Sequence, residues 1–164
     1  MRIVSLVKNK KTYQSLFLQT VNKLIMQVFI VGSPIYTAKH LDRLRLNKQI
    51  VECGQILSAL HGETKAWLNH PCTKQYERHQ LWLHYYRMSL MKYKIGDLSL
   101  AEWYSKAADY IRPKFHIQEY YDQMKRRLYT KNPIHYVVWK RLGESYENWY
   151  WSYSENKWLK YKQN

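Results

Sequence analysis

Cysteine is scarce in this chain of 164 residues, which contains only Cys53 and Cys72. Neither belongs to a C-x-x-C pair, so the sequence offers no disulfide framework and no cysteine-based zinc site, and a reducing compartment is expected. No apolar run approaches the length of a transmembrane helix. A Gly-rich phosphate loop and an H-E-x-x-H motif are also absent. We therefore expect no membrane span, no metal and no cofactor.

Acidic residues are few, because 27 Lys and Arg stand against 12 Asp and Glu, which gives a formal net charge of +15. So large a positive charge predicts attraction to polyanions. The chain also carries 16 Tyr and 7 Trp, and flat rings among basic side chains suit a phosphate backbone with exposed bases. A membrane-surface protein shares such a charge, but no segment shows an amphipathic pattern with one wholly basic face. A nucleic-acid partner is expected.

The first 25 residues contain no acidic side chain. They fit either a basic presequence for organellar import or an upstream start that extends a gene whose working start is Met26. The second interpretation is favoured, because Met26 begins a short apolar run suited to a buried strand or extended segment, which Gly32-Ser33-Pro34 ends. We expect a basic extension over 1–25 and one domain over 26–164, located in the cytoplasm or, for a viral protein, in the host cell.

Helical spacing dominates the rest of the chain and predicts an all-α, compact, single-domain helical bundle. The tail over 144–164 alternates aromatic and polar residues, which predicts a small C-terminal β-hairpin lying over the helices. We expect the protein to be a monomer. The predicted helices cover residues 37–61, 71–94, 99–111, 115–130 and a short stretch from 133 to 140.

The helix predicted over 37–61 organises the chain, with Thr37 as its N-cap and Gly62 just past its end. One face is an apolar stripe that should pack into the core. Beside it runs a second row, spaced by three and four residues, which places polar groups where apolar neighbours exclude water. Two interpretations stay open: a helix-surface ion network whose members satisfy each other, or the wall of a polar pocket. The stripe is Leu46, Ile50, Cys53, Leu57 and Leu60, and the row is Asp42, Arg45, Gln49 and Glu52.

Other polar residues stand at predicted helix starts, where each has a plain interpretation as a cap or a satisfied core group. Lys125, Arg126 and Arg127 form a basic cluster that is either a solvated face or a phosphate contact. The polar residues at the helix starts could line one cleft together with the row on the first long helix. They are Asn69-His70-Pro71, His116, and the run from Lys131 to Tyr136 that includes His135.

These motifs carry a resemblance to a known family. The order HLDRLRLNKQIVE, WLNHP, a long helix and YTKNPIHYVVW resembles the pyrimidine-dimer DNA glycosylases, closest to their bacterial and phage branch, over about residues 26–142. The resemblance implies a compact helical fold that binds duplex DNA across a basic face. It also implies a glycosylase that cleaves the abasic strand through an imine formed by its own N-terminal amine, with a carboxylate on the first long helix.

The sequence departs from the family pattern at two points. The family's catalytic Glu directly follows an Arg, whereas Leu46 follows Arg45 here, so Asp42 and Glu52 are the candidate catalytic carboxylates. The second departure concerns the amine that forms the imine. An N-terminal amine near the cleft requires a start at Met26, and otherwise Lys48 would have to supply the amine, with a pKa lowered by burial. An inactive nucleic-acid-binding module and a nucleotide- or modified-base-binding protein are the alternatives. We expect Arg45, Lys48, Gln49, Asn69, His70 and His116 to position the substrate, and Arg126, Arg127, Lys131, His135 and Tyr136 to bind phosphate.

Overall fold

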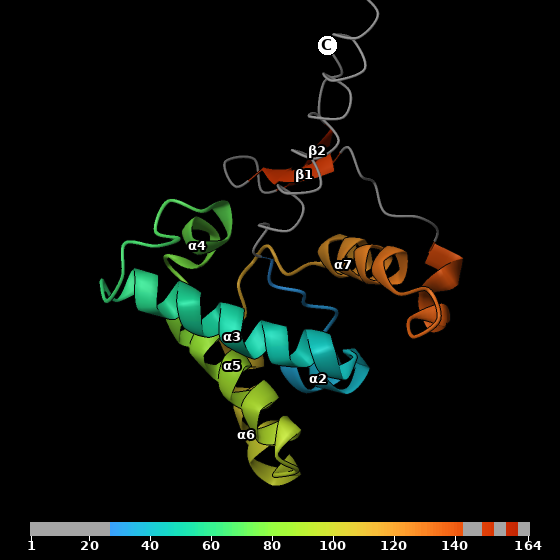
Figure 1. Ribbon diagram of the computed structural model, residues 1–164, viewed down its shortest axis with the longest axis horizontal. Helices are drawn as coiled ribbons and strands as arrows, with labels where there is room; N and C mark the ends of the chain where they lie inside the picture. Colours follow the sequence, from blue (N-terminus) through green and yellow to red (C-terminus); the bar gives the residue numbers. More distant parts are fainter. Residues whose placement is uncertain (1–26, 143–148, 153–156, 161–164) are drawn as a thin grey trace, which may run out of the picture.

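The predicted helical bundle is confirmed by a computed structural model, which describes residues 27–142 together with 149–152 and 157–160 (Figure 1). Helix α5 packs against α2, α3 and α6, and α7 packs against the 3-10 helix η1. In Figure 1, α5 and α6 lie on one side of α3, with α4 and α7 on the other. The helices are α2 (Pro34–His40), α3 (Arg43–Leu60), α4 (Pro71–Tyr76), α5 (Gln80–Lys94), α6 (Leu98–Tyr110), α7 (Gln118–Lys131) and η1 (Val137–Leu142).

Two short strands lie in the tail for which a hairpin was predicted. Strand β1 (Trp149–Ser152) pairs antiparallel with β2 (Lys157–Lys160), with Trp149 opposite Lys160. The rest of the tail and the predicted extension over 1–25 lie outside the described residues. The packing of the tail over the helices therefore stays a prediction.

The single helix predicted over 37–61 is wrong, because the chain leaves helical geometry at Leu41 and Asp42. Ser33 caps α2, and Asp42 caps α3 by accepting a hydrogen bond from the Arg45 backbone N–H at 2.9 Å. An Asp side chain competes in this way with helical hydrogen bonds and favours a new helix start. Thr37 is consequently not a cap but a buried residue within α2.

The apolar stripe of α3 does face the core. Leu46, Cys53 and Leu57 are buried, and Ile50 and Leu60 pack against them from its edge. Gly62, just past the helix, adopts a φ of +77°, which glycine accommodates without steric cost. The long helix predicted over 71–94 is also divided, since α4 ends at Tyr76 and α5 begins at Gln80.

The extended segment from Gln27 to Val31 is the centre of the core, and side chains rather than a neighbouring strand satisfy its backbone. Residues 28–31 are all buried, which confirms the buried segment expected there. The Gln49 amide accepts from Phe29 N–H at 2.8 Å and donates to the Gln27 carbonyl at 2.6 Å. Tyr86 donates its hydroxyl to the Phe29 carbonyl at 2.7 Å, and Thr37 accepts from Val31 N–H at 3.2 Å. Three helices thus hold one segment.

Replacing Gln49 by Leu should destabilise the protein strongly while keeping side-chain volume. The Phe29 N–H and the Gln27 carbonyl would lose partners inside the core, at a cost of about 1–3 kcal/mol for each unsatisfied group. The free energy of unfolding from denaturant titration measures the loss. Gln55→Leu is the matched control, because Gln55 is exposed on the same helix. Equal stability of the two variants would contradict the assigned role of Gln49.

Candidate functional site

The polar row of α3 forms two satisfied pairs. A guanidinium nitrogen of Arg45 lies 2.6 Å from a carboxylate oxygen of Asp42, and the Gln49 amide donates to a Glu52 carboxylate oxygen at 3.2 Å. Gln49 and Glu52 are buried, while Asp42 and Arg45 are half-buried. The network interpretation is therefore correct for these contacts, but it does not account for the second oxygen of Glu52.

Glu52 stands at the edge of the core beneath several cations. Its other carboxylate oxygen lies 3.6 Å from the exposed Lys48 ammonium, and its side chain is only 9% exposed. Burial raises the pKa of Glu52 above its usual range, and this outweighs the lowering by Lys48, by a hydrogen bond from the Gln27 backbone N–H and by the Lys131 charge. A raised pKa makes a carboxyl group better suited to take up and release a proton.

The cations of α7 come to the same place. Partial burial of the otherwise exposed Lys131 lowers its pKa, and the positive charges of Arg45, Lys48 and Arg127 lower it further, while Glu52 opposes them. Such mutual effects require these groups to be close together. The structure thus gathers predicted residues from two helices around one carboxylate. We call this cluster the Glu52 site: Arg45, Lys48, Gln49, Glu52, Arg127 and Lys131.

Asp42 has a different setting from Glu52. Besides capping α3 and pairing with Arg45, its carboxylate accepts a hydrogen bond from the Tyr136 hydroxyl at 2.8 Å. Burial would raise the pKa of Asp42, but the hydrogen bonds from Arg45 and Tyr136 together lower it. These contacts favour the ionised carboxylate, which joins the start of α3 to Arg45 and Tyr136.

Tyr136 was predicted to contact phosphate, and its position corrects that expectation. Its ring is 1% exposed, stacks on Trp139 with centroids 5.2 Å apart, and carries the Arg45 guanidinium 5.7 Å from its centroid. Its hydroxyl also accepts from the Asp42 backbone N–H at 3.1 Å. The side chain holds the turn after α7 against the start of α3, and no part of it faces solvent enough to receive a phosphate.

The remaining predicted residues separate into exposed and buried groups. Asn69 is exposed, and His70 caps α4 by accepting from Cys72 N–H at 3.2 Å. Burial raises the pKa of Cys72 to about 12, and the Glu52 charge adds to this rise. Helix α4 packs against α3, the helix that carries Glu52. Arg126 is half-buried on α7, and His135 is exposed.

His116 lies in the aromatic core, which corrects its predicted role in positioning substrate. Its Nε2 lies 3.3 Å from the Tyr76 hydroxyl, and its ring centroid lies 4.4 Å from that of Trp82. Burial lowers the pKa of His116 well below its usual value, followed by the charges of His79 and Arg112. The core-group interpretation is thus correct for this histidine. Gln49 is corrected in the same way, because its amide is occupied by the backbone of residues 27–29.

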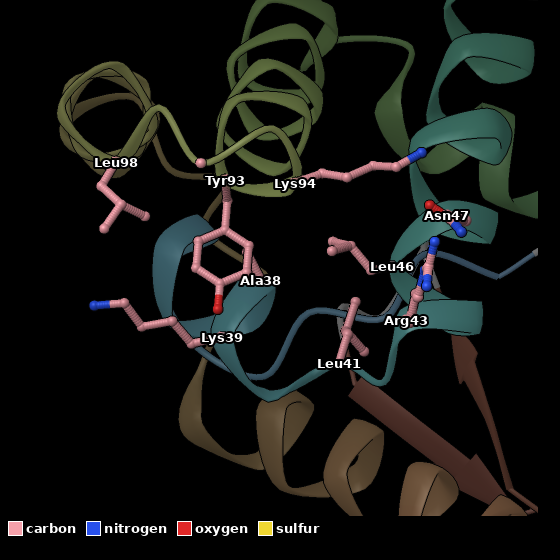
Figure 2. Close-up of a pocket in the computed structure, with 10 residues that line it drawn as sticks. Ala38, Lys39, Leu41, Arg43, Leu46, Asn47, Tyr93, Lys94 and Leu98 are labelled. Atoms are coloured by element: carbon pink, nitrogen blue, oxygen red, sulfur yellow. The ribbon is translucent and has the colours of Figure 1, made fainter.

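A pocket on a different face of α3 escaped prediction (Figure 2). It has a volume of about 550 Å³, and no acidic side chain lines it. Figure 2 shows Leu41 and Leu46 within it, and Lys94 extending toward Asn47. Its residues come from four helices and the two turns between them, so no local motif could have revealed it. They are Ala38, Lys39, Leu41, Arg43, Leu46, Asn47, Tyr93, Lys94, Gly96 and Leu98.

Within the described ranges, no group of three or more His, Cys, Asp or Glu side chains could hold a metal ion. The helices of the same ranges include none with the length and apolar character needed to cross a membrane.

Comparison with protein families confirms the resemblance seen in the sequence. Residues 26–93 match the family model of the pyrimidine dimer DNA glycosylases. The matched stretch includes the extended segment, all of α3 and nearly all of α5, but it ends before the YTKNPIHYVVW motif. Neither the curated proteins nor the solved structures gave a match.

The buried His116 should make stability depend on pH. Its pKa is lowered in the folded state, whereas an unfolded histidine titrates near about 6.5. Its contribution is therefore fully present above about pH 6.5 and is lost as the pH falls, because only the unfolded chain takes up the proton, at up to about 1.4 kcal/mol per pH unit. Unfolding free energies from pH 7.5 to 5 should fall less steeply in His116→Phe.

His84→Phe, which alters an exposed histidine of α5, is the matched control and should keep the wild-type slope. An unchanged slope in His116→Phe would show that the buried ring does not resist protonation.

Proposed function

We propose that this protein is a DNA N-glycosylase that removes pyrimidine dimers or other modified bases from duplex DNA, with Glu52 as its catalytic carboxylate. The family match over residues 26–93 supports the substrate class, because it contains both the extended segment and the Glu52 helix. The observation that carries the assignment is the buried Glu52 carboxyl group, in contact with Lys48, Gln49 and the Gln27 N–H.

Glu52 suits this role better than Asp42. Glycosidic cleavage leaves positive charge on the sugar, and a nearby carboxylate stabilises that charge and moves protons. Glu52 has a raised pKa and lies among cations that attract phosphate. Asp42 caps a helix and has a lowered pKa, so its carboxylate is already occupied by structural hydrogen bonds.

The extended segment supports lyase activity through an N-terminal amine. Glu52 accepts a hydrogen bond from the backbone nitrogen of Gln27, and a chain that starts at Met26 carries its α-amine one residue earlier. An α-amine is partly neutral near pH 7, with a pKa of about 7.7–8.0, and can attack C1′ of the sugar as the base leaves. The resulting imine permits cleavage of the strand. Lys48, 3.6 Å from Glu52, is the alternative amine.

The cations of the Glu52 site hold the DNA during this reaction. Arg127 and Lys131 of α7 and Lys48 of α3 form a positive surface beside the carboxylate. Extrusion of a nucleotide costs a few kcal/mol, which contacts to the backbone must offset. Asn69, which is exposed beside the His70 cap of α4, contacts the extruded nucleotide in this proposal.

Glu52→Gln should slow excision strongly while DNA binding persists. The variant keeps the side-chain shape but loses the charge, so excision of a pyrimidine dimer from a labelled duplex should slow by about 10²–10⁴-fold. Glu63→Gln, on the exposed turn after α3, is the matched control and should act like the wild type. Near-normal excision by Glu52→Gln, with thermal unfolding unchanged, would remove Glu52 from the mechanism.

Borohydride should trap a covalent complex between the protein and a duplex that contains an abasic site, because reduction fixes the imine. We expect the adduct in protein that starts at Met26, and mass spectrometry of the digested adduct should place it on the N-terminal residue. An adduct on Lys48, lost in Lys48→Arg, would assign the amine to that side chain. An enzyme that excises bases without any adduct would contradict the lyase step.

The second candidate is a nucleic-acid-binding module that retains the fold without the chemistry. The position directly after Arg45 favours it, because the buried apolar Leu46 stands there. This candidate requires salt-dependent binding of duplex DNA, no excision, and equal affinity in the wild type and in Glu52→Gln.

A further inference from the structure

The turn that follows α7 presents an unusual amount of apolar surface to solvent. Ile134 is 90% exposed, Val137 is 60% exposed and Val138 is 63% exposed. Single exposed aliphatic residues are common on protein surfaces, but three within five residues form a patch that calls for a partner. We call these three residues the apolar ridge.

The ridge stands on a rigid base. The Asn132 side chain accepts from His135 N–H at 3.2 Å, and the Tyr136 hydroxyl is bonded to Asp42 at the start of α3. His135 Nε2 lies 3.2 Å from the His40 carbonyl, within hydrogen-bond distance. The turn is thereby fixed to both α2 and α3. A fixed turn pays little conformational entropy when it inserts into a partner.

Basic residues surround the ridge and decide which partner fits. The stretch from 131 to 142 contains Lys131, His135, Lys140 and Arg141 and no acidic residue. All four of these side chains are exposed. An apolar centre with a cationic rim complements a base-pair step, whose stacked faces are apolar and which is flanked by backbone phosphates.

We propose that Ile134 is a wedge that inserts between adjacent base pairs of duplex DNA and unstacks them, while Lys131 and His135 contact the flanking phosphates. This inference rests on the proposed function and adds the residue that deforms the duplex. Arg45 links the turn to the Glu52 site, because its guanidinium lies 5.7 Å from the ring centroid of Tyr136, two residues after Ile134. Unstacking beside the Glu52 site lowers the cost of extruding the target nucleotide.

Ile134→Ala tests the wedge by two readouts. Affinity for a duplex with an abasic-site analogue, measured by anisotropy, should fall about tenfold or more, because the apolar contact with the bases is lost. The slope of log affinity against log salt should not change, since no charge is removed. A 2-aminopurine base next to the lesion should brighten when the wild type binds, and this increase should be lost in the variant.

Two controls separate a wedge from a general surface effect. Ile95→Ala removes an aliphatic side chain that is 71% exposed at the end of α5, and it should leave affinity and fluorescence unchanged. Lys131→Ala should instead reduce the salt slope by about one, as loss of a phosphate contact requires.

The proposal is overturned if Ile134→Ala binds and unstacks the duplex like the wild type. It is also overturned if the thermal unfolding temperature of free Ile134→Ala falls by several degrees, because the side chain would then pack against the protein's own chain. Normal DNA binding and excision with no 2-aminopurine change would reject the wedge and leave the proposed function intact. A wild-type protein that does not bind duplex DNA would reject both.

Discussion

The structure depends on one side-chain amide. Gln49 supplies an acceptor to Phe29 and a donor to the Gln27 carbonyl, and so replaces the neighbouring strand that a buried extended segment would otherwise need. Buried backbone groups are paired in almost every folded protein, because leaving them unpaired costs as much as a substantial part of the net stability. The segment is completed by Tyr86 and Thr37, so three helices are fixed relative to it.

The same amide connects the scaffold with the chemistry proposed for it. Gln49 donates to Glu52, one turn further along α3, and the Gln27 nitrogen donates to the same carboxylate. The candidate acid is therefore positioned by the Gln49 amide and the Gln27 nitrogen, which also hold the extended segment in the core. Around it, Lys48 and Lys131 offset part of the cost of burying a carboxylate, and they also attract phosphate. Stability and the proposed DNA affinity thus depend on the same charges.

Sequence reasoning found the helical architecture and the polar row, because both appear as periodicities that any helix must show. It missed the break at Asp42, since capping by that side chain competes with continuation of the helix and the apolar pattern runs on across the junction. It assigned Gln49 to substrate, because the partners of that amide are backbone groups 20 and 22 residues away, and a backbone group leaves no pattern in the sequence. The roles predicted for His116 and Tyr136 were wrong for a related reason. Tertiary packing decides whether a polar ring faces solvent or the core, and both rings are buried.

The bond between Tyr136 and Asp42 joins parts of the chain that are far apart in sequence. Asp42 begins the helix that bears the candidate acid, and Tyr136 ends the turn that follows the cationic helix α7. The Tyr136–Asp42 hydrogen bond thus sets the spacing between the candidate acid and the surface proposed to bind phosphate. If this hydrogen bond broke, α3 and α7 could both remain folded while a bound duplex was displaced from the candidate acid. Tight binding would then no longer guarantee cleavage.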